Sequence, residues 1–101
     1  MSIATLYDNS GCLVTITGKF TFEDNPVFRE IIRAIAEKNL SMLALDMTET
    51  DFVDSAALGM LLLARDTANT HQKKMVIRGI RGQVKKMFEL AHFEQLFTIT
   101  Y

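Results

Sequence analysis

The sequence is poor in cysteine, proline and glycine, and it contains no tryptophan. Its 101 residues include one Cys, one Pro and five Gly. The single cysteine, Cys12, cannot form a disulfide within the chain, and its apolar neighbours predict a buried, unreactive thiol. One Cys and two distant His residues also disfavour a structural zinc site. We therefore expect no metal and no cofactor.

Neither sign of charge dominates, and no apolar run is long. Eleven Lys and Arg against twelve Asp and Glu give a net charge of −1, which provides no basic surface for nucleic acid. The longest apolar run, residues 56–64, is about half of the roughly 18 residues that a membrane span requires, and the N-terminus shows no secretory signal. We expect one domain over residues 1–101 that is cytoplasmic and binds neither nucleic acid nor membrane.

Hydrophobic periodicity predicts alternating strands and helices. A turn-rich cluster at Asp8 to Gly11 separates the first two strands. The first helix is signalled by Asn25 as a cap, Pro26 at the first helical position, and apolar residues spaced at three and four. The predicted strands are 3–8, 12–18, 41–47, 74–78 and 96–100, and the predicted helices are 26–38, 56–69 and 83–92.

This order defines an α/β fold with a mixed sheet of four or five strands and three or four helices. The first two strands form an N-terminal antiparallel hairpin. From residue 41 onward, strands alternate with helices, which predicts right-handed crossovers between parallel strands. Residues 48–54 are expected to form a loop that leads into the second helix.

The junction before the second helix is the main candidate site. Sites in open α/β sheets form beyond the carboxyl ends of strands, where strand passes to helix. Ser55 is placed to cap the helix, and capping alone would explain it. A helix start also tolerates a phosphate, because it presents unpaired N–H groups and a partial positive charge. Ser55 is therefore expected to cap the helix, and a serine that caps an exposed helix start can also be phosphorylated without unfolding the domain.

The second helix is apolar over more of its circumference than packing on a sheet requires. Residues 56–64 carry no polar side chain, although one apolar stripe is enough for a helix on a sheet. A helical wheel directs five residues toward the sheet: Ala57, Met60, Leu61, Ala64 and Ala68. Leu62 and Leu63 fall outside this stripe. They form either a docking surface for another protein or a contact with the third helix or a loop.

The residues around Ser55 resemble a known family. Val53-Asp54-Ser55-Ala56-Ala57-Leu58-Gly59 is similar to the Asp-Ser-Ser/Thr-Gly-Leu-Gly signature of STAS domains, specifically of bacterial anti-sigma factor antagonists. The order of elements, the strand before the signature, and residues 84–88 followed by Phe93 extend the resemblance over essentially the whole chain. It implies a STAS-like single domain.

The resemblance implies partner switching rather than catalysis. In this family the unmodified antagonist binds an anti-sigma factor that is also a serine kinase. Phosphorylation of the serine after the signature aspartate releases the antagonist, and a serine phosphatase resets it. By position the phospho-acceptor is Ser55. The expected partner-binding residues are Asp54, Ser55, Ala56, Gly59, Leu62 and Leu63.

Two residues depart from the signature. Ala56 stands where Ser or Thr is usual, which removes a second hydroxyl but keeps the acceptor. Ala57 stands where Gly is usual, and its methyl group is expected to narrow the approach of a partner backbone. Both changes concern which partner is bound. We expect a monomer, with a dimer left open by the exposed leucines.

Two other functions compete with the phosphorylation switch. One is a non-switching STAS subunit that docks constitutively on a cytosolic partner, such as a lipid-transport ATPase complex. The other is an enzyme that uses Asp46, Asp51 and Asp54 as metal ligands or acid–base groups. No lysine, histidine or Gly-rich phosphate loop stands near these carboxylates in sequence, so the enzyme is disfavoured.

Overall fold

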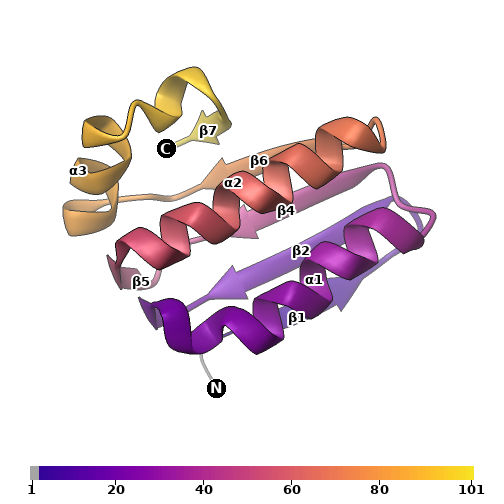
Figure 1. The fold of residues 1–101 in the computed structure, drawn as a ribbon, viewed down its shortest axis with the longest axis horizontal. Coiled ribbons are helices and arrows are strands. Elements are labelled where there is room, and N and C mark those ends of the chain that lie inside the picture. Colours follow the sequence, from indigo (N-terminus) through magenta and orange to yellow (C-terminus); the bar gives the residue numbers. More distant parts are fainter. Residues whose placement is uncertain (1–2) are drawn as a thin grey trace.

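The computed structural model describes residues 3–101, and its main feature is a five-stranded mixed sheet (Figure 1). The strand order is β1-β2-β4-β6-β7. Strands β1 and β2 are antiparallel, and the β2–β4, β4–β6 and β6–β7 pairs are parallel. The predicted mixed sheet with an N-terminal hairpin is confirmed. The strands are β1 (Ile3–Tyr7), β2 (Gly11–Ile16), β4 (Met42–Asp46), β6 (Lys74–Arg78) and β7 (Thr98–Thr100).

The hairpin turn is held by one carboxylate. Asp8 Oδ1 accepts hydrogen bonds from the main-chain N–H groups of Ser10 and Gly11, both at 2.8 Å. These bonds lower the pKa of Asp8. An Asx-type turn of this kind fixes the register of the two strands that it joins.

Two helices, α1 (Asn25–Glu37) and α2 (Ser55–Thr70), lie side by side on one face of the sheet (Figure 1). The hydrophobic core fills the space between them and the strands. The rings of Phe20 and Phe28 meet there, with centroids 5.2 Å apart. The largest fully buried side chains are Phe20, Phe28, Phe88, Ile16, Ile35, Leu43, Leu45, Met47, Leu61, Ile77, Val14 and Val53. Cys12 is also buried, as predicted, and burial raises the pKa of its thiol.

The start of α1 differs from the prediction. A short 3₁₀ turn, η1 (Phe22–Asp24), runs directly into the helix, so Asn25 already has helical backbone angles and is not the cap. Asp24 occupies the cap position instead. Its carboxylate reaches back to accept a hydrogen bond from the main-chain N–H of Thr21 at 2.9 Å. This closes a capping box around the 3₁₀ turn.

A second sheet of two parallel strands, β3 (Gly18–Phe20) and β5 (Thr50–Val53), was missed in the sequence. The prediction made residues 48–54 a loop because they contain five polar or charged side chains in no strand-like alternation. The pairing is long-range in sequence, and the buried Thr50 anchors it. The Thr50 hydroxyl donates to the carbonyl oxygen of Ile16 at 2.6 Å.

The C-terminal part contains α3 (Gly82–Leu90), a 3₁₀ turn η2 (Phe93–Gln95) and the edge strand β7. The predicted third helix ends two residues too late, because His92 adopts a left-handed conformation with φ of 58°. The rings of Phe88, Phe93 and Phe97 are tilted against one another with centroids about 5 Å apart, and they pack this part onto the core. Within residues 3–101, no helix is both long and apolar enough to cross a membrane.

Candidate functional site

The site is the junction between β5 and α2. Strand β3, helix α3 and the 3₁₀ turn η1 hold it in place. Strand β3 pairs with β5 on one side. On the other, the side-chain amide of Gln83 in α3 binds the main chain of Val53 twice. Gln83 Oε1 accepts from the Val53 N–H at 3.0 Å, and Gln83 Nε2 donates to the Val53 carbonyl oxygen at 3.1 Å. The last residue of β5 therefore has both main-chain groups paired, two residues before Ser55.

Asp54, not Ser55, caps α2. The Asp54 backbone is extended, and its Oδ1 accepts a hydrogen bond from the Ala57 N–H at 2.8 Å. Its Oδ2 accepts from the main-chain N–H of Phe22 at 3.1 Å, so one carboxylate joins the start of α2 to η1. The predicted cap is therefore wrong by one residue. Asp and Ser are equally good caps, and what distinguishes Asp54 is its second hydrogen bond, from the distant Phe22 N–H.

Ser55 is the first helical residue and lies exposed at the surface. Because Asp54 takes the capping role, the Ser55 hydroxyl is not needed to pair a backbone N–H. Across the described residues, 3–101, the Ser55 hydroxyl makes no hydrogen bond. The hydroxyl is thus accessible to another protein, and modifying it would break no contact within the fold.

The outward side of α2 continues from Ser55 as an uncharged strip. Ala56 and Gly59 are exposed, and Leu63 is 45% exposed. We call Ser55, Ala56, Gly59 and Leu63 the α2 strip. They recur every three or four residues, so they share one side of the helix.

Leu62 differs from Leu63, although the sequence grouped the two. Leu62 is partly buried and packs against the core cluster. These leucines were expected to form either a docking surface or a contact within the chain. Leu62 is partly covered within the chain, whereas Leu63 remains exposed. The five residues that were predicted to face the sheet are all buried, which confirms the helical wheel.

Ala57 corrects a further expectation. Its side chain is fully buried, so its methyl group faces the core and cannot narrow the approach of a partner. Gly59 has no side chain, so the backbone of α2 is exposed on its outward side at this position. A Cβ built on Gly59 would meet no atom within 4 Å.

Two exposed phenylalanines near the junction escaped the sequence prediction. Phe22 in η1 is 65% exposed and Phe52 in β5 is 38% exposed. The Phe22 N–H donates a hydrogen bond to Asp54, and Phe52 lies two residues before Asp54 in the chain. At both positions the sequence has a bulky aromatic residue within a polar segment, and this pattern could have indicated an exposed ring.

The three carboxylates considered for catalysis have separate roles. Asp46 accepts a hydrogen bond from the Thr48 N–H at 3.0 Å, and hydrogen bonds from Thr48 lower its pKa. Asp51 is exposed and lies 3.3 Å from the guanidinium of Arg81. Asp54 holds the two backbone N–H groups described above. Among the described residues, no cluster of three or more His, Cys, Asp or Glu side chains could hold a metal ion.

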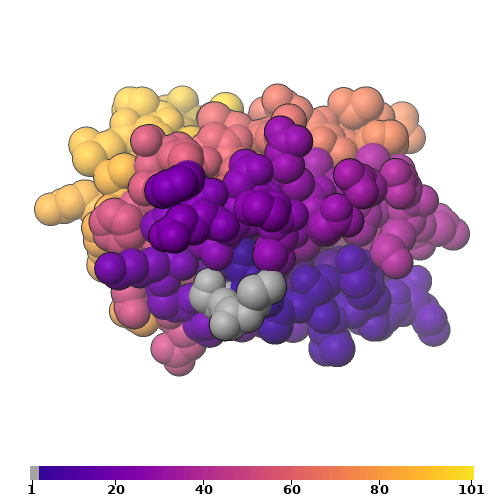
Figure 2. All heavy atoms as spheres, turned by 60° about the horizontal axis from the view of Figure 1, so that its bottom comes forward, coloured from indigo at the N-terminus to yellow at the C-terminus, as the bar shows by residue number. Residues whose placement is uncertain are grey.

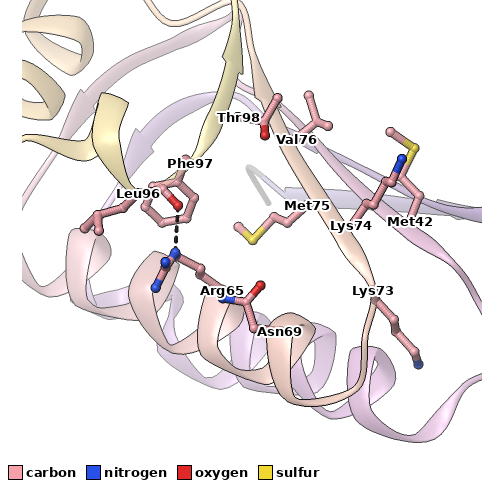
Figure 3. A pocket seen from close by; sticks show the side chains of 10 residues that line it. All are labelled: Met42, Arg65, Asn69, Lys73, Lys74, Met75, Val76, Leu96, Phe97 and Thr98. Atoms are coloured by element: carbon pink, nitrogen blue, oxygen red, sulfur yellow. Dashed lines mark hydrogen bonds between the residues drawn. The ribbon is translucent and has the colours of Figure 1, made fainter.

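A cavity of about 480 Å³ lies away from the junction, between the C-terminal half of α2, the start of β6 and the segment before β7 (Figure 3). Arg65 spans its mouth, with Nε donating to the carbonyl oxygen of Leu96 at 2.6 Å. Lys73 also borders it, but its ammonium group binds the carbonyl oxygens of Ile35 and Lys38. None of the lining residues belongs to the predicted site, and the cavity is not part of it.

Comparison with known proteins identifies the family. The family model of the STAS domain matches residues 3–101, so the chain belongs to the STAS domain family. A STAS-domain containing protein of Pseudomonas aeruginosa is 31% identical over 93 residues, which are 92% of this chain and 91% of the relative. The predicted family and fold are thereby confirmed.

Antagonists are found among the similar proteins, in sequence and in structure. The anti-sigma-B factor antagonist of Listeria monocytogenes is 22% identical over 86 residues, covering 85% of this chain and 75% of the relative. The fold also matches the phosphorylated form of the Bacillus cell fate determinant SpoIIAA, with a TM-score of 0.78 at 11% identity. That match covers 98% of this chain and 91% of SpoIIAA. At 11% identity the structural likeness shows a shared fold.

Proposed function

We propose that the protein is a phosphorylation-controlled partner switch. In the unmodified state it binds and sequesters an anti-sigma factor that is also a serine kinase, through the α2 strip and Asp54. Phosphorylation of Ser55 releases it, and a serine phosphatase restores the binding form. The observation that carries the proposal is the exposed Ser55 hydroxyl, which has no bonding role in the fold, next to uncharged surface.

The covalent step belongs to the partner kinase. The γ-phosphoryl group of ATP is transferred to Ser55 Oγ, the hydroxyl proton passes to a base of the kinase, and ADP leaves. The product carries between about 1.5 and 2 negative charges at pH 7. Because the kinase and ATP are needed, the proposed switch operates in the cytoplasm.

The fold tolerates this phosphate, whereas the complex does not. At the start of a helix, the phosphate meets the positive end of the helix dipole and free N–H groups. The partner, however, would cover Ala56, Gly59 and Leu63, and closing that dry contact over a dianion costs its desolvation. Closing the contact also removes the water that screens the phosphate from the neighbouring Asp54 carboxylate, which two hydrogen bonds hold in place, so their repulsion increases in the complex.

The direct test is the intact mass of the protein purified from its own cells. We expect a fraction with an increment of about 80 Da, the mass of one phosphate group, mapped to Ser55. Ser55→Ala should lose this increment. Ser41→Ala, which changes another exposed serine, should keep it. Stoichiometric phosphate in Ser55→Ala would show that the site is wrong.

A binding measurement tests the switch itself. Ser55→Ala should bind the partner kinase but resist release by ATP. Ser55→Asp should weaken docking by about 2–5 kcal/mol, the range for an unpaired charge at a buried interface. Wild-type affinity in Ser55→Asp would contradict the mechanism.

The same experiments separate the switch from its alternative. A non-switching STAS subunit, such as one docked on a lipid-transport ATPase complex, would carry no phosphate on Ser55. It would co-purify with its partner in the presence and absence of ATP. Changes in the α2 strip would weaken that complex too, so the response to ATP is the discriminating readout.

A further inference from the structure

The outer edge of strand β1 is unusually open. In chain order its five residues are Ile, Ala, Thr, Leu and Tyr, with no charge and no proline, and its ladder with β2 has no bulge. Natural proteins protect sheet edges with charged residues, prolines and bulges, or with very short strands. The opposite edge is protected in that way, because β7 has only three residues.

The register shows which backbone groups this edge presents. The Asp8 N–H donates to the Gly11 carbonyl oxygen at 3.0 Å, so this pair is hydrogen bonded. In an antiparallel ladder, bonded and non-bonded pairs alternate, and the bonded pairs that follow are Leu6 with Leu13 and Ala4 with Thr15. The N–H and C=O groups of the odd-numbered residues, Ile3, Thr5 and Tyr7, therefore point outward, away from β2.

Helix α1 leaves the edge uncovered. Thr5 and Tyr7 point toward the helix layer, yet both are exposed. A groove of about 290 Å³ separates them from α1, and it is bordered on the helix side by Val27, Glu30, Ile31, Arg33, Ala34, Glu37 and Lys38. Figure 2, which turns this side toward the reader, shows the N-terminal hairpin (indigo) at the surface beneath α1 (purple).

We propose that this edge pairs with β1 of a second copy of the chain, in antiparallel orientation about a two-fold axis at Thr5. The two five-stranded sheets then become one continuous sheet of ten strands. This inference is independent of the proposed phosphorylation switch. The pairing is isologous, since each partner contributes the same strand.

The strand is complementary to itself in this register. Thr5 lies opposite Thr5 of the partner copy, and Ile3 lies opposite Tyr7, so every outward N–H and C=O of the three residues finds a partner. Thr–Thr and aromatic–β-branched pairs are among the favourable cross-strand combinations. On the other face, Leu6, which is 69% exposed, comes to lie beside Ala4 of the partner copy.

Charge does not oppose the pairing. No charged side chain lies on β1, so no like charges meet across the new ladder. Along the groove, Glu30 is paired with Arg33 at 3.2 Å, and Lys38 Nζ lies 4.6 Å from the centre of the Tyr7 ring. The groove provides room for the Thr5 side chain of the partner copy, while Ile3 stays in its own core.

Sedimentation velocity of the full chain over a dilution series tests the pairing. We expect about twice the 11.4 kDa chain mass at sub-millimolar concentration, falling to the monomer mass on dilution. Thr5→Lys places two lysines opposite each other at the axis and should raise the dissociation constant by at least roughly tenfold. Thr98→Lys, which changes an exposed threonine on the opposite edge strand, should leave it unchanged.

A charge-reversal mixture keeps the test independent of folding defects. Thr5→Lys mixed with Thr5→Asp should restore the dimer as a heterodimer, because opposite charges then meet at the axis. A wild-type protein that stays at 11.4 kDa throughout the series overturns the proposal. So does a dimer that Thr5→Lys leaves intact, since its interface must lie elsewhere.

Discussion

Helix α2 is apolar on two sides, and the two sides have different surroundings. The inner side, with Ala57, Leu61 and Ala64, is fully buried against the sheet. The outer side carries Ala56, Gly59 and Leu63, which are all exposed. The inner side accounts for stability. The outer side has no such role within the chain. The proposed partner binding explains why it carries no charge over residues 55–63, before the exposed Asp66.

The same contrast appears in the size of the side chains. The inner side combines Met60 and Leu61 with three alanines, which lets α2 lie close to the sheet. The outer side carries only a hydroxyl, a methyl and a bare backbone over its first turns, and its first bulky residue is Leu63. A flat surface of this kind allows a second protein to approach the helix backbone closely.

The largest effect is expected on the inner side. Leu61→Ala removes a fully buried side chain from the centre of the core and should lower the free energy of unfolding by about 2–5 kcal/mol. Chemical denaturation followed by circular dichroism measures this change. A loss below about 1 kcal/mol would mean that the core closes over the missing atoms, and the contrast between the two sides would weaken.

The next effect concerns the residue that fixes where the helix begins. Asp54→Ala removes the cap at Ala57 and the bond to the Phe22 N–H, and should cost about 1–2 kcal/mol in unfolding free energy. Asp51→Ala is the matched control. Its exposed contact with Arg81 should contribute less than about 1 kcal/mol. Equal losses in the two variants would contradict the capping role of Asp54.

Gly59→Ala should separate stability from binding. The added methyl group meets no atom within 4 Å, and alanine is favoured over glycine inside a helix, so unfolding free energy should rise by about 0.5–1 kcal/mol. Partner affinity should fall, since the methyl group stands between the helix and the partner. Calorimetry of unfolding and of binding gives both values. A gain in stability with unchanged affinity would place Gly59 outside the interface.

The smallest effect on folding is expected at Leu63. Leu63→Ser should change unfolding free energy by no more than about 0.5 kcal/mol while it weakens partner binding. Changing Leu62 as well would confuse the result, because Leu62 packs against the core. Leu90→Ser, at a more exposed leucine on α3, is the control and should bind as the wild type does. A clear loss of thermal stability in Leu63→Ser would assign Leu63 to the core.

Local pattern was sufficient for most of the fold. Helical spacing identified the buried side of α2, and alternation together with a turn cluster identified the hairpin of β1 and β2. Both patterns relate residues that are close in sequence, so they can be recognised in the sequence without knowledge of the tertiary contacts. The family signature around Ser55 is local in the same sense, and it makes the junction before α2 the candidate site.

Tertiary structure decided the features that depend on distant segments. The pairing of β3 with β5, the contact of Gln83 with Val53 and the bond from the Phe22 N–H to Asp54 each join residues about 30 apart in sequence. These contacts fix which of two adjacent capping residues, Asp54 or Ser55, takes the helix start. The sequence by itself determined the α/β order and the candidate serine. Only packing determined that the Ser55 hydroxyl is left exposed and that Leu63, but not Leu62, stands beside it at the surface, because burial depends on which segments meet in space.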